Sequence, residues 1–572
     1  MAAGRPALHR LMRNRRGALI AFGGGAVALT ALSSTMAAFL DDGEPATADA
    51  SGAQQTPQKA GSFANRDASY TVGVGDPNDL GAGGVAATPS AAAQAALAAT
   101  PRFPTPLSRD PVLHLLRRTT FGPTPADVAE VKQIGIDAWI DRQLDPAAIP
   151  DPGGDQVNAM YPYLRLDIKQ LRASVPDDKR DDPSRQLGRA TIGRQIWTSR
   201  QLEELMVDFW ANHLNIQNPF DGGQDNRTDW DRTVIRKYAL GKFSDMLLAS
   251  ARHPAMLRYL NNADSDKRSV NENYGRELLE LHTVGIDGGY NETDVRNCAY
   301  VMTGRTVDRN GNFVFEPRRH WTGAVKVMGF SHPNKKAAEG LAVGDALVRY
   351  LATHPSTARY IARKLAVRFV CDNPPNPLVD RLAQAYLQNG TAIVPVLQLM
   401  FRSIEFWMAT GLKTRRPLEN MVATARVVGV KPGADTDKAL ESMYNSADRL
   451  GHAPLAWGPP DGYPDVAGAW QSAHGMLGAW NSHRAMVQGR VRGLSFTAPE
   501  SLVGGNRNAT VGSYVDAMAQ RLVFQPLNPE QKVAVLKFLG LADTAKVTDP
   551  KLGGRVEHLA PLLLDSVYHG LR

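Results

Sequence analysis

The sequence predicts a mostly α-helical protein: one large multi-helix domain with a small β-hairpin, preceded by a signal or anchor segment and a disordered linker. Apolar residues recur at helical spacing along most of residues 106–572. Helix start signals, in which a capping residue precedes a proline, recur in the same region. Residues 41–105 have no sustained apolar period. Length alone leaves the domain count open, because 572 residues can form one large helical domain or several ordinary ones.

The first 40 residues have the pattern of an export signal. A cationic stretch at residues 11–16 precedes an apolar run at 18–32, and small residues near 37–38 suit cleavage. We therefore expect an exported protein with a signal peptide, secreted to the periplasm or beyond the cell. The alternative is an inner-membrane anchor formed by residues 17–40, because an uncleaved run of about 24 residues is long enough to span a bilayer.

The net charge of +8 does not indicate a nucleic-acid-binding protein. Five arginines in the first 40 residues supply +5, which leaves 8 − 5 = +3 for the remainder. No basic run or basic face stands out there, so the electrostatic footprint of a nucleic-acid-binding protein is missing. We exclude nucleic-acid binding as the main role.

The linker and the start of the folded region differ in composition. Residues 41–105 are rich in Ala, Gly, Pro, Ser and Thr and cannot bury enough apolar surface to offset the entropy of ordering, so a disordered tether is expected. Asp110 and Thr124 are each followed by a proline that suits the first helical position. They predict helices ending near Gly122 and Gly135.

Helical periodicity dominates the rest of the chain. It predicts helices at residues 137–144, 199–215, 243–253, 356–370, 378–388, 392–407, 417–429, 529–540 and 557–570. The one convincing β signal is residues 311–329, where two short runs flank a polar turn and predict a hairpin.

The two cysteines, Cys298 and Cys371, both lie in apolar stretches. Export permits a disulfide between them, whereas a buried free thiol would behave as a small apolar side chain. Their pairing stays open. Two cysteines exclude a zinc cluster built from thiolates.

Polar functional groups are concentrated in residues 269–290. Ser269 and Glu272 have the spacing of a capping box, which predicts a helix over residues 270–283. Such a helix would bury one stripe and carry a polar row on another side. The stripe comprises Tyr274, Leu278 and Leu281, and the polar row comprises Asn273, Glu277 and Glu280.

In a functional site, Glu277 and Glu280 would act as an acid/base pair or as metal ligands, because neighbouring carboxylates raise one another's pKa. Arg276 lies one turn from both Glu272 and Glu280 and would tune them. Asn273 would orient a ligand through hydrogen bonds. The plain alternative is a helix with a charge-paired face toward solvent.

His213 and His282 are candidate ligands for a divalent metal at this site. His213 lies on the apolar stripe of its predicted helix, where a satisfied core histidine is the alternative. On an ideal helix His282 points about 200° away from Glu280, so a shared ligand set requires the helix to end there. The spacing matches neither the di-iron bundles nor the zincins, which leaves the cofactor unknown.

Residues 456–471 form a long loop rich in proline and aromatic residues. If Trp457, Tyr463 and Trp470 are exposed, they would stack on sugar rings. If they are buried, they would anchor the loop. The anchoring role is favoured, because long ordered loops need such contacts.

Several segments, in this order along the chain, closely resemble the bacterial domain of unknown function 1800. They are LRRTTFGPTPADV, DFWANHLN, ARHPAML, NENYGRELLELHTVGIDGGY, TGR, FEPRRHWTG, HPSTARYIARKLAVRFV and WGPPDGYPD. The resemblance covers roughly residues 108–572. It implies an exported, largely helical protein for which no catalytic residues are assigned. The usual T-G-W of that family is Thr303-Gly304-Arg305 here.

The resemblance also implies a partner. Genes of that family often lie beside genes of a second exported family, numbered 1501, which resembles alkaline-phosphatase-type hydrolases. A product of such a neighbouring gene is therefore a candidate partner, and membrane contact is expected only through the N-terminal segment.

Two functions follow. The first is an exported hydrolase or metal-assisted enzyme that acts on an envelope or extracellular polymer, with Glu277 and Glu280 converging with His213 on a pocket. The second is a non-catalytic binding or assembly partner of an exported alkaline-phosphatase-like enzyme. It predicts a filled core at residues 269–290 and an exposed apolar patch elsewhere.

Overall fold

The computed structural model describes residues 105–220, 222–497, 501–503 and 509–572. The predicted export segment, residues 1–40, and the predicted linker up to residue 104 lie outside these ranges. Among the described residues, no helix has both the length and the apolar character needed to cross a bilayer.

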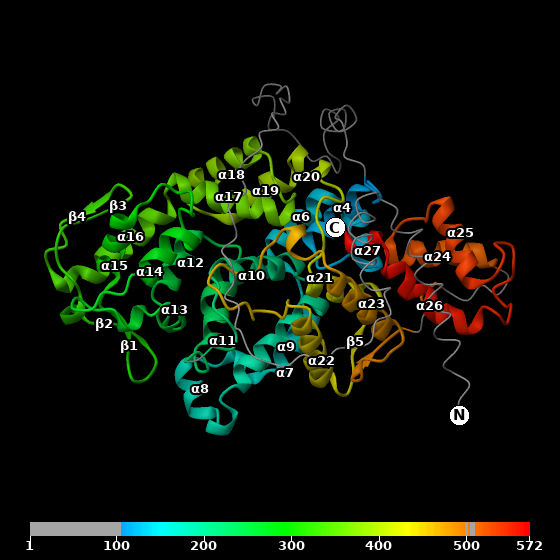
Figure 1. Ribbon diagram of the computed structural model, residues 1–572, viewed down its shortest axis with the longest axis horizontal. Helices are drawn as coiled ribbons and strands as arrows, with labels where there is room; N and C mark the ends of the chain where they lie inside the picture. Colours follow the sequence, from blue (N-terminus) through cyan, green and yellow to red (C-terminus); the bar gives the residue numbers. More distant parts are fainter. Residues whose placement is uncertain (1–104, 221, 498–500, 504–508) are drawn as a thin grey trace, which may run out of the picture. The chain divides into compact units, whose positions relative to one another are not determined.

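The described chain is mostly helical, as predicted, and carries three small antiparallel sheets (Figure 1). Its first helices are α4 (Pro111–Thr119), α5 (Pro125–Ile134), α6 (Ile136–Leu144), η2 (Pro146–Ala148), α7 (Pro152–Met160), η3 (Pro162–Arg165), α8 (Ile168–Ser174), η4 (Asp177–Lys179), α9 (Asp182–Trp197) and α10 (Gln201–His213).

The central helices are α11 (Arg227–Trp230), η5 (Asp231–Arg236), α12 (Phe243–Ser250), α13 (Pro254–Tyr259), η6 (Asn262–Asp264), α14 (Asn273–Glu277), η7 (Leu278–His282), α15 (Glu292–Met302), η8 (Pro317–Arg319), η9 (Ala337–Glu339), α16 (Gly340–Ala352), α17 (Pro355–Phe369) and α18 (Asn376–Gln388). Of these, η5 and η7 are π-helical.

The last helices are α19 (Ile393–Phe401), α20 (Ile404–Met408), α21 (Pro417–Val427), α22 (Thr436–Arg449), η10 (Ala467–Ala469), α23 (Ala473–Val487), α24 (Val511–Val523), α25 (Pro529–Leu539), α26 (Gly553–Leu564) and α27 (Val567–Gly570). Two segments predicted as single helices are each divided. Ser403 starts α20 by accepting a hydrogen bond from the Phe406 amide, and Ser566 stands at the start of α27.

The predicted helix starts are confirmed. The Asp110 side chain accepts hydrogen bonds from the amides of Val112 and Leu113, and Thr124 forms a capping box with Asp127. Each of these residues precedes a proline at the first helical position, so the local sequence alone specifies where α4 and α5 begin.

The predicted hairpin at residues 311–329 is wrong in its pairing. Strand β2 (Phe313–Phe315) pairs back with β1 (Arg305–Val307), and β3 (Val325–Val327) pairs forward with β4 (Phe330–His332). The turn η8 separates β2 from β3, so the two runs belong to different hairpins. A third pair joins β5 (Lys431–Pro432) to β6 (Leu494–Ser495). Arg305 is buried and pairs with Asp345 at 2.8 Å.

Both cysteines are free thiols. Cys298 is buried and Cys371 is half-buried. Burial raises the pKa of the Cys298 thiol to about 12, so this side chain stays protonated and packs as an apolar group.

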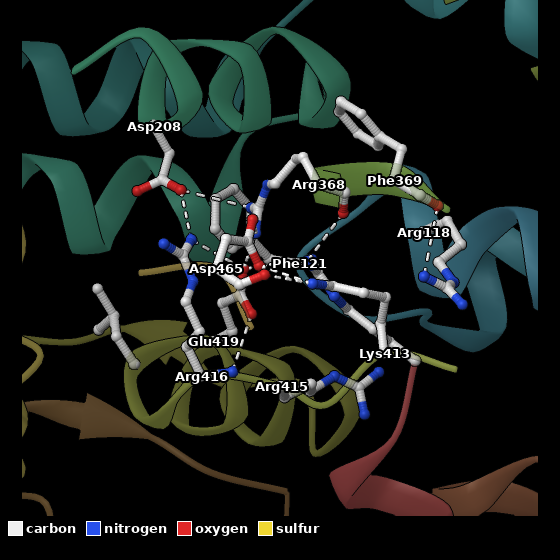
Figure 2. A network of polar contacts seen from close by, with 12 residues as sticks. Arg118, Phe121, Asp208, Arg368, Phe369, Lys413, Arg415, Arg416, Glu419 and Asp465 are labelled. Atoms are coloured by element: carbon white, nitrogen blue, oxygen red, sulfur yellow. Dashed lines mark hydrogen bonds and ion pairs between the residues drawn. The ribbon is translucent and has the colours of Figure 1, made fainter. Parts of the chain in front are cut away.

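A buried ion network lies where α10, α17 and α21 meet the loop of residues 455–471 (Figure 2). It consists of seven charged side chains, none more than 20% exposed: Asp208, Arg368, Lys413, Arg416, Glu419, Asp465 and Arg572.

Glu419 is the centre of this network. Its Oε1 lies 2.5 Å from Arg368 Nη1, 3.0 Å from Arg416 Nη2 and 3.2 Å from Arg572 Nη1. Burial alone would raise the pKa of this carboxyl, but the three guanidinium groups hold it well below its ordinary value. The charge is therefore tolerated in the interior because it is multiply paired.

Asp208 and Asp465 connect the outer elements to this centre. Asp208 Oδ2 lies 2.5 Å from Arg416 Nη2 and 3.4 Å from Arg368 Nη2. Asp465 lies 3.1 Å from Lys413 Nζ and 3.4 Å from Arg368 Nη1. The network thus fixes α10, α17 and the 455–471 loop against one another.

Candidate functional site

The helix predicted over residues 270–283 is shorter than expected, and its predicted capping box is absent. The helix begins at Asn273, and the side chain of its N-cap residue, Glu272, makes no capping hydrogen bond. Upstream, the Asp266 carboxylate accepts from the amides of Arg268 at 2.7 Å and Ser269 at 3.0 Å. This local turn holds Ser269 away from the helix start, which is why the sequence spacing alone misleads.

The second half of the same segment is π-helical. The α14 helix ends at Glu277 and continues as η7, Leu278–His282. A π turn takes more residues than an α turn, so the buried stripe shifts: Leu279 is buried, whereas Leu281, predicted to be buried, is half-buried. Short π segments inside helices are frequent at functional sites.

Two glycines allow this segment to pack closely. A Cβ at Gly275 would lie 2.8 Å from the Ala299 nitrogen on α15, and one at Gly285 would lie 2.9 Å from the Tyr360 ring on α17. Gly285 also has a φ of +85°, which L side chains rarely adopt. The glycines therefore place the η7 end directly against α17.

Arg276 and Glu280, predicted to pair with each other, bind different partners. Arg276 forms a bidentate pair with Glu292, at 2.8 and 2.7 Å, and lies 3.8 Å from the predicted partner Glu272. Glu280, the other predicted partner of this arginine, instead accepts a hydrogen bond from the Tyr290 hydroxyl at 3.0 Å. The guanidinium thus braces α14 against the start of α15.

Asn273 and Glu277 differ in their contacts. The Asn273 amide donates to the Leu260 carbonyl at 3.3 Å, which ties α14 to the end of α13. Among the described residues, Glu277 has no hydrogen-bond or ion-pair partner. Burial, followed by the charges of Glu280 and Asp461, raises its pKa to about 7. It is therefore a carboxyl group of which about half is still protonated near neutral pH.

His213 and His282, the predicted metal candidates, are adjacent and buried. His213 Nε2 lies 3.1 Å from the His282 carbonyl oxygen, and its ring packs 6.0 Å from that of Tyr360. Burial, then the charge of Lys364, lowers the pKa of His282 to about 3. Neither ring nitrogen of His282 has a hydrogen-bond partner among the described residues. Both histidines are therefore neutral at physiological pH.

Within the described ranges, no group of three or more His, Cys, Asp or Glu side chains is arranged to hold a metal ion. The two histidines approach each other through a ring and a backbone carbonyl, rather than by presenting two ring nitrogens to one point.

Lys364 and Asp461 join this region from other parts of the chain. Lys364, on α17, is half-buried and lies 5.4 Å from the centre of the Tyr360 ring. Asp461 belongs to the 455–471 loop and interacts electrostatically with both Glu277 and Lys364. Its carboxylate accepts from the Trp457 indole at 2.7 Å. Burial lowers the pKa of Lys364 to about 8, against the opposing effect of Asp461.

We call this region the Glu277 junction. It comprises Glu277, Glu280, Tyr360, Lys364 and Asp461. Electrostatic interaction links Glu277 with Glu280 and with Asp461 of the 455–471 loop. His282, at the end of the same helix, meets His213 through its backbone carbonyl. Sequence patterns alone did not indicate Tyr360, Lys364 and Asp461. Their only sequence signal is that they lie in segments that also carry the family resemblance.

The loop aromatics pack mainly on one another. The Tyr463 ring lies 5.0 Å from Trp457 and 5.9 Å from Trp470, and its hydroxyl donates to the Ala453 carbonyl at 2.8 Å. The Tyr259 hydroxyl also donates to the Gly458 carbonyl. These contacts confirm that the aromatic residues anchor the loop.

The ion network and the Glu277 junction share two elements, α17 and the 455–471 loop. Arg368 lies one helical turn after Lys364, Asp465 follows Asp461 by four residues, and Asp208 precedes His213 on α10. Buried ion pairs therefore hold both α17 and the 455–471 loop, the two elements that carry Tyr360, Lys364 and Asp461. Such support fixes the geometry of a site.

We expect Gly462→Ala to detach the loop from α10. Gly462 has a φ of +75°, and an added Cβ would lie 2.1 Å from the Asn212 carbonyl oxygen. The substitution is expected to cost about 1–2 kcal/mol from the backbone conformation alone. Hydrogen exchange over residues 455–465 should accelerate.

Gly468→Ala in the same loop is the matched control, since its added Cβ would meet no atom within 4 Å. Equal exchange rates in the two variants would contradict the close packing of this loop on α10.

Fold and junction together define a large helical protein whose polar surface site is assembled from a π-terminated helix, a neighbouring helix and an anchored loop. The chain belongs to the family described as "Protein of unknown function (DUF1800)", whose model matches residues 114–567. No curated protein and no solved structure matches the chain.

Proposed function

We propose that the protein is an exported hydrolase that cleaves an envelope or extracellular polymer, with Glu277 as its general acid. The observation that carries the proposal is the state of Glu277: half-buried, unpaired among the described residues, and placed near Glu280 and Asp461. A carboxyl group with a pKa of about 7 can donate a proton to a leaving group at neutral pH.

The neighbouring carboxylates supply the complementary role. Hydrolysis by a carboxyl pair needs one protonated acid and a second carboxylate that activates water or attacks the substrate. Glu280, held by the Tyr290 hydroxyl, and Asp461, held by the Trp457 indole, are the candidates for that second group. No step in this scheme requires a metal ion.

The test is polymer cleavage by the full chain across pH. Purified protein is incubated with isolated cell-wall polymers and extracellular polysaccharides, and released reducing ends or soluble fragments are measured from pH 5 to 9. The proton on Glu277 is lost as the pH rises through about 7, so activity should decline on the alkaline side with an apparent pKa near 7. Fragment release that is absent, or equally strong in Glu277→Gln protein, overturns the proposal.

A non-catalytic assembly role is the second candidate, and one observation favours it. Met476 and Leu477, near the start of α23, are 52% and 55% exposed, and Val466 in the preceding loop is 39% exposed. Exposed apolar side chains of this kind suit a protein partner, such as an exported alkaline-phosphatase-like enzyme. Replacing Met476 and Leu477 with Ser should abolish co-purification of such a partner, and unchanged co-purification argues against this role.

A further inference from the structure

A small cavity lies between α4, α21, α24 and α27. Arg117 of α4, Arg415 just before α21 and His569 of α27 line it, and the other described residues around it are uncharged. Its volume is about 10 Å³, and it is partly open to solvent. A space of this size admits one water molecule or one ion of similar size.

Arg117 is a buried cation with weak partners. Its side chain is 2% exposed and donates to the carbonyls of Ser108 and Val523, both at the long distance of 3.4 Å. Among the described residues, no carboxylate lies within ion-pair distance of its guanidinium group, although Asp110 acts on it from farther away. Burial lowers the pKa of Arg117 to about 10, so the group is still charged at neutral pH.

Arg415 lies beside the buried ion network but forms no ion pair with any described residue (Figure 2). Its Nη1 donates to backbone carbonyls at the end of α27, whereas its Nε and Nη2 have no hydrogen-bond partner in the described part of the chain. Burial, followed by the charges of Arg117 and Arg572, lowers the pKa of Arg415 to about 9, against the weaker opposing effect of Glu419. This group, too, is charged at neutral pH.

The two cations therefore face one cavity whose described walls carry no acid. Burial keeps the third polar wall residue, His569, uncharged, and its Nε2 lies 2.9 Å from the Thr424 hydroxyl. Two like charges repel each other strongly where water is scarce. A water molecule in this space would accept hydrogen bonds without cancelling the repulsion, whereas an anion would cancel it and accept the same hydrogen bonds.

We propose that this cavity is a binding site for a chloride ion held between the guanidinium groups of Arg117 and Arg415. Chloride is a single sphere only slightly larger than a water molecule, so it suits the volume of the cavity. Phosphate and sulfate, each with four oxygens around a central atom, are too large. The bound ion joins α4 to the segment before α21. The proposal is independent of the proposed hydrolase, because no residue of the Glu277 junction lines this cavity.

The first test is ³⁵Cl NMR on the full chain at neutral pH, where both arginines are charged. The chloride signal broadens when the ion exchanges between water and a protein site. We expect broadening that bromide reverses and that sulfate at equal ionic strength does not reverse, because only the halide fits. Absence of broadening, or equal reversal by bromide and sulfate, overturns the inference.

Variants locate the ion. Arg117→Gln removes one of the two charges and should bind chloride at least about tenfold more weakly, the usual effect of losing a hydrogen bond from a charged group. Arg117→Lys keeps the charge and should bind within about fivefold of the wild type. Arg318→Gln is the control, because Arg318 is 84% exposed and lies 3.3 Å from Glu316, away from the cavity. Equal chloride affinity of Arg117→Gln and Arg318→Gln overturns the assignment.

The stability of the wild type gives a readout that does not depend on the folding of any variant. An ion that binds only the folded protein raises its melting temperature. Replacing gluconate, which is too large for the cavity, with chloride at constant ionic strength should raise the melting temperature by at least about 2 °C. Arg318→Gln should show the same gain, and Arg117→Lys most of it. A melting temperature that is equal in chloride and gluconate contradicts the proposed site.

Discussion

Replacing Glu419 with Gln is expected to destabilise the protein by about 3–5 kcal/mol, the usual cost of removing one partner from a buried ion pair. The side chain is 3% exposed and has three guanidinium neighbours, those of Arg368, Arg416 and Arg572. Glutamine keeps the size but removes the charge, so these arginines would remain buried with less compensation. Thermal and urea unfolding would measure the loss.

The matched control is Glu441→Gln. Glu441 also pairs with an arginine, Arg189, at 2.5 Å, but its side chain is 48% exposed. Removing an exposed pair is expected to cost about 0–1 kcal/mol. A similar loss of unfolding free energy in the two variants would contradict a large contribution of the buried ion network to stability.

The contribution of Glu419 also depends on pH with a defined sign. Its pKa in the folded protein lies well below the unfolded value of about 4.3. The unfolded chain therefore binds the proton more readily, and the stabilisation is present above pH 4.3 and lost as pH falls further. The difference in stability between wild type and Glu419→Gln should accordingly narrow in acid.

Glu277→Gln is expected to reduce polymer cleavage by about 10²–10⁴-fold, the usual contribution of a general acid. The amide has the same shape but cannot give a proton to the leaving group. Glu339→Gln serves as control, because this 56%-exposed carboxylate is paired with Lys336 away from the junction. Comparable loss in both variants contradicts a specific role for Glu277.

The same substitution should make the protein more stable at alkaline pH. The folded-state pKa of Glu277, about 7, lies above the unfolded value of about 4.3. The folded protein therefore binds the proton more tightly, and stability declines as the pH rises between these values. Glutamine has no carboxyl to ionise, so it avoids the cost of placing a charge at this position. The melting temperature of Glu277→Gln should therefore exceed that of wild type at pH 8, and the difference should disappear near pH 4.

The helical fold class and about half of the helices could be predicted from local sequence signals. Capping residues followed by proline located α4 and α5, and apolar periodicity located α10, α17 and α21. The helices that were not predicted include α7, α8, α9, α15, α16, α22, α23 and α24. In α9, glycines interrupt the apolar pattern. Gly188 and Gly193 allow Tyr444 and Leu440 of α22 to pack against this helix, a requirement that only the tertiary structure reveals.

The candidate site was predictable only in part. The polar row drew attention to Glu277 and Glu280, but helical geometry at 100° per residue could not anticipate the π turn that follows Glu277. Lys364 and Asp461 come from segments about 90 and 180 residues away along the chain, and single-sequence patterns carry no information on such long-range contacts.

The ion network could not be predicted from the sequence for a related reason. Charged residues are ordinarily exposed, so a run such as Lys413-Thr414-Arg415-Arg416 suggests a solvated surface. Its burial depends on acids supplied by α10, α21 and the 455–471 loop.

The most direct test of the account is the pKa of Glu277 itself. Protein labelled with ¹³C at the glutamate side-chain carboxyl is titrated by NMR, and the Glu277 resonance is identified by its absence in Glu277→Gln. We expect a midpoint near 7, which leaves about half of this carboxyl protonated at neutral pH and able to donate a proton. A midpoint near the ordinary value of about 4.3 would contradict it.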